Sequence, residues 1–193
     1  MVFFYQCINP QNRVISRPDS SVIMAKSDSF FIRQSVNVKN TTGFFQEEIG
    51  LGAYVSALGK SVLRIHNIAI SMTDETGTSA TLKADESAAA QFQLTTQFQT
   101  DTVRADDRSV IASGMINCVN QESGDSVASV VSEAFDNLPQ LWTNGYLIAT
   151  ESIYLGGEAS AGFKEEVFVT AVLECTVETM TQASAMALSL SQQ

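Results

Sequence analysis

Two long stretches of alternating side chains constrain the fold of this chain more than any other feature. Residues 30–39 and 167–178 place mainly apolar side chains at every second position, as in the series Val167, Val169, Ala171, Leu173 and Cys175. A period of two is typical of strands that bury one face in a core. Residue types that carry out chemistry are scarce, because the chain contains one histidine and three cysteines. The sequence therefore predicts a β-rich domain built for packing and contact more than for catalysis.

The rest of the pattern predicts a mainly β fold, a jelly roll or β-sandwich of about eight antiparallel strands with one main helix. Further strands are expected at residues 61–72, 91–99, 109–119 and 145–155. The first of these should contain a β-bulge at His66 and Asn67, where the apolar positions change parity. Residues 126–138 predict the main helix, because Asp125 or Ser126 can cap an apolar helical stripe that Pro139 ends. Residues 44–58 predict a short helix followed by an irregular stretch.

The two ends of the chain carry weaker patterns. Residues 2–8 predict an edge strand and residues 22–24 a short strand. Residues 181–193 predict either a final strand or a swapped arm, and removing an arm should impair assembly without unfolding the monomer. With 193 residues and no linker or repeat, we expect one β-sandwich domain over residues 1–193 with ordered terminal arms.

Charge excludes some classes of partner. The chain has 21 acidic and 11 basic residues, a net charge of −10, and no run of lysine or arginine. Because nucleic-acid binding needs a basic patch, we expect no direct contact with nucleic acid. No apolar stretch approaches the roughly 20 residues of a membrane span, so we expect no membrane insertion. The first residues also lack the charged start of a signal peptide, which predicts synthesis in the cytosol, with the protein either kept there or released only by lysis.

No motif identifies an enzyme, a cofactor or a metal site. Gly59, Lys60 and Ser61 resemble the end of a phosphate loop, but the earlier glycine of that motif is replaced by Tyr54. His66 is expected to be a half-buried strand residue. The three cysteines, at positions 7, 118 and 175, show no metal-ligand spacing and are expected to be small buried apolar residues. Asp101, Asp106 and Asp107 are expected to lie in a solvated loop.

Candidate contact residues come instead from uncharged surfaces. The glutamine face of residues 91–99 carries no charge to repel another strand, so it is either an ordinary solvent face or one buried against a neighbouring subunit. Trp142 is either a contact residue or a core anchor. Met186, Leu188 and Leu190 alternate with small residues in the tail. The candidate subunit interface therefore contains Gln91, Gln93, Gln97, Gln99, Trp142, Met186, Leu188 and Leu190.

The pattern of expected strands, with one helix between late strands, resembles that of a viral family. The strands that carry the resemblance are at residues 30–39, 61–72, 91–99, 109–119, 145–155 and 167–179. The chain resembles the single jelly-roll capsid proteins of icosahedral viruses whose DNA lies inside an internal membrane. The resemblance implies a major capsid protein that forms capsomers with itself and contacts other shell proteins. It also implies assembly in the host cytoplasm, location in the virion and no catalytic residues.

Two other classes of function stay open. A carbohydrate-binding or adhesion-type sandwich is the main alternative, because Trp142, Tyr146 and Tyr154 could stack on a sugar. A cupin-like metalloenzyme ranks third, since such sites use several imidazoles and this chain has one histidine.

Overall fold

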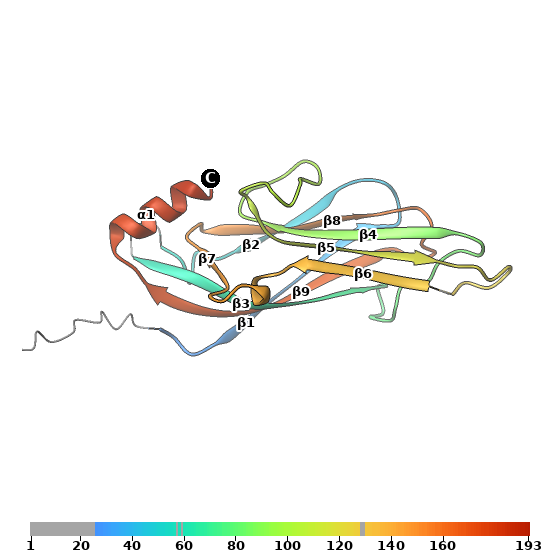
Figure 1. Ribbon diagram of the computed structural model, residues 1–193, viewed down its shortest axis with the longest axis horizontal. Coiled ribbons are helices and arrows are strands. Elements are labelled where there is room, and N and C mark those ends of the chain that lie inside the picture. Colours follow the sequence, from blue (N-terminus) through green and yellow to red (C-terminus); the bar gives the residue numbers. More distant parts are fainter. Residues whose placement is uncertain (1–25, 57, 59, 128–129) are drawn as a thin grey trace, which may run out of the picture.

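The computed structural model describes residues 26–56, 58, 60–127 and 130–193, and within them the chain forms two packed antiparallel sheets (Figure 1). The four-stranded sheet has the order β1 (Phe30–Lys39), β9 (Val167–Thr179), β3 (Ser61–Thr73), β7 (Tyr146–Ile148). The five-stranded sheet has the order β2 (Phe45–Gly50), β8 (Ser152–Ala159), β4 (Ser87–Thr95), β5 (Val110–Val119), β6 (Val130–Asn137). A 3-10 helix, η1 (Pro139–Leu141), precedes β7, and α1 (Gln182–Ser191) ends the chain.

The strand pairs are nested. β1 pairs with β9, β2 with β8, β3 with β7, and β4 with β5, so strands from the first half of the chain meet strands from the second half in reverse order. The chain is thus one long hairpin wound into two sheets, with β6 added beside β5. This is the jelly-roll arrangement. The predicted mainly β fold is confirmed.

The core lies between the two sheets and follows the alternation of the sequence. In β9, Val167, Val169, Ala171, Leu173 and Cys175 are all fully buried, while the intervening side chains face outward. The bounds of β1 match the prediction. The register of β3 against β9 shifts between Ile65 and Asn67, so the expected bulge is confirmed at His66. A bulge of this kind moves the apolar series to the other parity without taking it out of the core.

The prediction of a helix at residues 126–138 is wrong. Residues 130–137 form β6, which pairs antiparallel with β5 from Val130 opposite Val119 to Asn137 opposite Ser113. The apolar spacing fits a helix, but Val130 and Val131 are β-branched, and the exposed edge of β5 offers backbone hydrogen bonds. Tertiary pairing therefore decides the structure of this segment.

The tail also differs from both alternatives that its alternation predicted. It forms α1, which begins after Thr181, whose hydroxyl accepts a hydrogen bond from the Ser184 amide at 3.2 Å. Alanine, leucine and methionine dominate the segment, and these residues have high helix propensity. The helix lies at one end of the sandwich (Figure 1) and packs on its own domain.

Three smaller expectations are corrected by strand pairing. Residues 45–50 form β2 rather than a helix, because β8 supplies a partner for every residue from Phe45 to Gly50. The strand expected at 91–99 begins earlier and ends at Thr95. The strand expected at 145–155 is two strands, β7 and β8, which belong to different sheets. The strands expected at 2–8 and 22–24 lie outside the described residues.

Cys118 and Cys175 are free thiols buried in the core, as expected for small apolar residues, and Cys7 lies outside the described residues. Burial raises the pKa of the Cys175 thiol to about 12, which keeps it protonated and unreactive. Within the described part of the chain, no three His, Cys, Asp or Glu side chains are grouped as metal ligands. No helix in this part has the length and apolar character needed to cross a bilayer.

Candidate subunit interface

The helix α1 is held against the sandwich by a narrow contact. Its inner face consists of Ala185, Leu188, Ser189 and Gln192, which are buried or half-buried. These positions are spaced three and four residues apart, as one helical face requires. Ala185 and Leu188 pack with Val62 and Ala149 in a small apolar cluster. Half of this inner face is polar, because Ser189 and Gln192 belong to it.

The opposite face of α1 is more apolar than the buried one. It consists of Ala183, Met186, Ala187 and Leu190, all exposed, and we call these four residues the outer stripe. Met186 is 45% and Leu190 is 68% exposed. The helix carries no charged side chain, whereas the exposed face of a surface helix normally does. An uncharged apolar face toward solvent is a common mark of a contact surface.

The end of α1 is bonded to the turn after β4, which carries another exposed apolar side chain. The Gln192 backbone carbonyl accepts hydrogen bonds from the Thr96 hydroxyl at 2.8 Å and from the Gln97 side-chain amide at 3.2 Å. The next residue, Phe98, is 65% exposed and packs edge-on against Tyr154, with ring centroids 5.8 Å apart. We call Phe98 and the outer stripe together the terminal patch.

Gln97 thus lies beside the terminal patch, whereas the other three predicted glutamines lie elsewhere and bond within their own chain. Gln93 is buried, donating to the Val103 carbonyl and accepting from the Val103 amide at 3.0 Å. Gln91 donates to the Thr102 hydroxyl at 3.0 Å, and Gln99 to the Ser109 hydroxyl at 3.0 Å. An amide side chain both donates and accepts, so it can pair with a backbone segment as a strand residue would. These glutamines fasten the loop after β4 to the five-stranded sheet.

Trp142 follows η1 and is 55% exposed, beside Leu141, which is 58% exposed. This exposure excludes the role of a core anchor. Leu188 faces the domain, whereas Met186 and Leu190 face solvent. The structure thus leaves Trp142, Met186 and Leu190 as the predicted contact residues that another molecule can reach most fully. Phe98, Ala183 and Ala187 were missed. For the two alanines a sequence signal exists, because Ala183, Met186, Ala187 and Leu190 have the i, i+3, i+4, i+7 spacing of one helix face.

The single histidine lies in a polar cluster on β3 and β9. His66 is half-buried, as predicted, and its Nε2 lies 2.9 Å from the Thr176 hydroxyl. Arg64 makes a two-pronged contact with the Glu178 carboxylate, with Nε at 2.7 Å and Nη2 at 2.8 Å. These hydrogen bonds lower the pKa of Glu178, while burial and the nearby cations Lys26 and Arg64 lower the pKa of His66. The contacts are those of a structural ion pair.

Replacing Arg64 with Met should lower the free energy of unfolding by about 1–3 kcal/mol at neutral pH, because the largely buried Glu178 carboxylate loses its main hydrogen-bond partner. Since the pKa of Glu178 is lowered in the folded state, this contribution is complete above its unfolded pKa. It is lost as pH falls through the lower folded-state value. Urea unfolding from pH 7 to pH 3 should show the difference between parent and variant shrinking. A difference that stays constant with pH would contradict this account, and an Arg64→Met, Glu178→Gln double variant is the control.

The aromatic residues of the carbohydrate-binding alternative are not grouped on one sheet. Tyr146 is in β7 of the four-stranded sheet, half-buried against the core, and burial raises its pKa. Tyr154 is in β8 of the other sheet and contacts Phe98. Trp142 follows η1. The structure therefore places two of these three rings in different layers of the sandwich.

Comparisons with known proteins add little to this picture. No family model matches the sequence, and no curated protein matches it. A solved structure from Desmodium yellow mottle tymovirus is similar over 89% of this chain and 96% of that chain, at 9% identity and a TM-score of 0.38. A TM-score at this level carries no argument. The interpretation of this chain therefore rests on its strand order and its surface.

Proposed function

We propose that this chain is a self-assembling structural subunit, a viral major capsid protein whose copies contact one another laterally to form a shell. The single observation that carries the proposal is the outer stripe of α1, an uncharged apolar helix face directed to solvent at one end of the sandwich. Jelly-roll domains serve many functions, so the fold alone does not carry it.

The chemistry of the terminal patch suits contact between copies. The chain carries a net charge of −10, so identical subunits repel one another at long range. A contact surface without charge avoids placing like charges against each other. Such a patch is small, and a single contact of this size is weak. Many equivalent contacts in a closed shell are jointly strong, because each bound subunit holds its neighbours at high effective concentration.

The proposal assigns the chain a place in the virion, with assembly in the host cytoplasm and contacts to itself and other shell proteins. It includes no catalytic role, no cofactor, no membrane insertion and no direct contact with nucleic acid. Because the repulsion between acidic copies is screened by salt while apolar contact is not, assembly should increase with ionic strength.

The test places charge in the terminal patch. A Met186→Glu, Leu190→Glu double variant should lower the association constant at least tenfold, because two buried carboxylates would oppose each contact. The matched control is Gln182→Glu, Gln193→Glu, which adds the same charge at two exposed positions outside the stripe. Light scattering and electron microscopy would report the mass and shape of the assemblies. Equal assembly of the double variant and the parent would overturn the proposed interface.

A carbohydrate-binding module is the second candidate, and the exposed ring of Trp142 is the observation that favours it. It predicts a monomer that binds a glycan and loses that affinity in a Trp142→Ala variant.

A further inference from the structure

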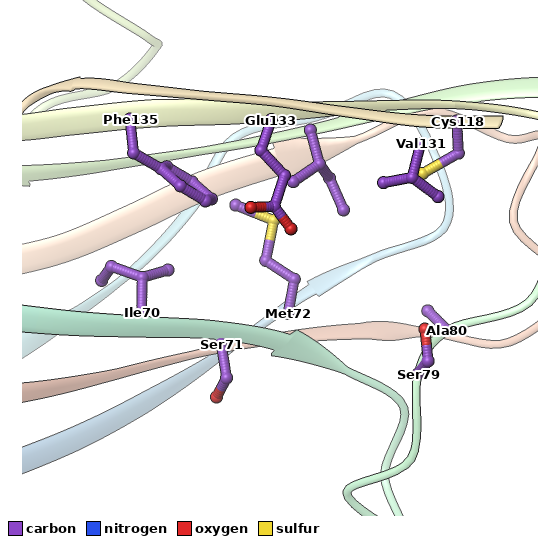
Figure 2. A pocket seen from close by; sticks show the side chains of 10 residues that line it. Ile70, Ser71, Met72, Ser79, Ala80, Cys118, Val131, Glu133 and Phe135 are labelled. Carbon is purple, nitrogen blue, oxygen red and sulfur yellow. The ribbon is translucent and has the colours of Figure 1, made fainter.

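A cleft opens between the two sheets, on the side of the sandwich where β3 faces β6. It has a volume of about 210 Å³. Figure 2 shows side chains of both strands directed into this space, namely Ile70 and Met72 from β3 and Val131, Glu133 and Phe135 from β6. Val131 lies on the inward face of its strand and is nevertheless 53% exposed. Apolar surface that a sandwich normally buries is therefore open to solvent here.

The walls of the cleft are mainly apolar and belong to the main core. Ile70, Met72, Ile116 and Phe135 are half-buried and pack against the fully buried core residues. Cys118, which is 5% exposed, also lines the cleft. Walls of this kind favour the apolar body of a ligand, because burying it removes apolar surface of both partners from water.

Glu133 places a carboxylate among these apolar side chains. It shares the inward face of β6 with Val131 and Phe135, because alternate residues of a strand point to the same side. Figure 2 shows its carboxylate directed into the cleft, toward Met72. In the described part of the chain, no side chain forms an ion pair with Glu133. Its charge reaches the inner wall, since it adds to burial in raising the pKa of the Cys118 thiol.

We propose that this cleft binds a small organic cation, a primary amine joined by a short linker to one ring or to a short alkyl chain. The apolar body lies between Met72 and Phe135, and the ammonium group donates to the Glu133 carboxylate. The volume suits a ligand of this size, because a cavity of about 150 Å³ holds benzene and the remaining space accommodates a short linker with its amine.

Charge selects the amine over neutral and anionic ligands of the same shape. An amine of the lysine type is protonated at neutral pH, so it can pair with the Glu133 carboxylate. A neutral ligand would remove water from this carboxylate without replacing it by a charged donor, and an anion would be repelled. The net charge of −10 on the chain also attracts cations at long range.

Binding in this cleft does not require assembly, because all of its lining residues come from one chain. It can therefore be measured on the full-length protein in dilute solution by NMR of methyl groups. The probe is 2-phenylethylamine, and a ligand of about nine non-hydrogen atoms should bind with a Kd on the order of 0.1–1 mM. The methyl signals of Ile70, Met72 and Val131 should shift and reach saturation.

Two further probes separate the contributions of charge and of apolar contact. 2-Phenylethanol keeps the ring and lacks the charge, whereas ethylamine keeps the charge and lacks the ring. Each should bind at least tenfold more weakly than 2-phenylethylamine, because each loses one of the two contacts.

A Glu133→Gln variant tests the carboxylate directly. It keeps the shape of the side chain and should lower the affinity for 2-phenylethylamine at least tenfold. The matched control is Asp136→Asn, which removes the same charge from the opposite face of β6 and should bind the amine as the parent does. The methyl signals of Leu173, which is fully buried in β9, report whether each variant is folded.

Two results would overturn the proposed site. The first is equal affinity of 2-phenylethylamine for the parent and for a folded Glu133→Gln variant, which would show that the carboxylate does not bind the amine. The second is the absence of saturable shifts at Ile70, Met72 and Val131 in the parent, which would show that the cleft holds no ligand of this class.

Discussion

A Phe92→Ala variant is expected to lose about 3–5 kcal/mol of unfolding free energy, the largest effect of any single substitution considered for this chain. Phe92 is fully buried at the centre of β4, and its ring lies 6.0 Å from that of Phe135. Its cross-strand partners are Gly114 in β5 and Gly157 in β8. Because neither glycine has a side chain that can move into the space, the cavity should stay open and the cost should lie near the upper end of this range.

Urea unfolding measures this loss as a lower midpoint with an unchanged slope. Phe98→Ala is the matched control, because it removes the same ring from a position that is 65% exposed. It should cost no more than about 1 kcal/mol, the value of its edge-on contact with Tyr154. Similar losses for the two variants would contradict the placement of Phe92 in the core.

Replacing Gln192 with Ala should detach α1 from the sandwich at a cost of about 2–4 kcal/mol. The Gln192 side chain accepts from the Ala149 amide at 3.0 Å and donates to the Leu147 carbonyl at 2.6 Å. Gln192 is 4% and Ala149 is 1% exposed, so water does not readily replace these bonds. Each buried backbone group left unpaired costs about 1–3 kcal/mol. The inner face of α1 has too little apolar surface to offset this loss.

Hydrogen exchange of the Ala149 amide and of the α1 amides reports the detachment directly. The neighbouring Gln193→Ala substitution is the control, because Gln193 is exposed and should leave exchange unchanged. If Gln192→Ala also leaves α1 protected, the helix is held by contacts other than this side chain. Deleting residues 181–193 was expected from the sequence to impair assembly without unfolding the monomer. The deletion would also uncover Val62 and Ala149, so it would disturb the monomer as well and is a poorer test of assembly.

The strands that could be predicted from the sequence are those with one fully buried face. β1 and β9 show a period of two over at least ten residues, and their bounds agree with the prediction. The bulge at His66 was also readable, because the apolar series changes parity where the register slips. In these segments, burial alone dictates the order of side chains.

The elements that could not be predicted depend on partners distant in the sequence. β2 and β6 are edge strands whose side chains are largely exposed, so their pattern carries little information about burial. Their strand conformation comes from backbone pairing with β8 and β5. The tail contains both an alternating and a helical spacing, and local helix propensity with the Thr181 cap decides between them.

The candidate interface could be predicted from the sequence only in part, for a related reason. The sequence identified Met186 and Leu190, but it assigned them to a final strand or a swapped arm rather than to one helix face with Ala183 and Ala187. It also grouped them with glutamines that bond within their own chain. Whether a polar side chain faces solvent, a loop or another subunit depends on the fold around it, which residue types alone do not specify.

The mass of the purified full-length protein in solution, measured by light scattering across concentration and salt, tests the central claim most directly. The account predicts oligomers or closed shells that grow with protein concentration and with ionic strength, and electron microscopy of the same samples should show them. A monomer of 20.8 kDa at every concentration and salt would contradict the account. That result would shift the interpretation to a binding module and make a glycan screen the next experiment.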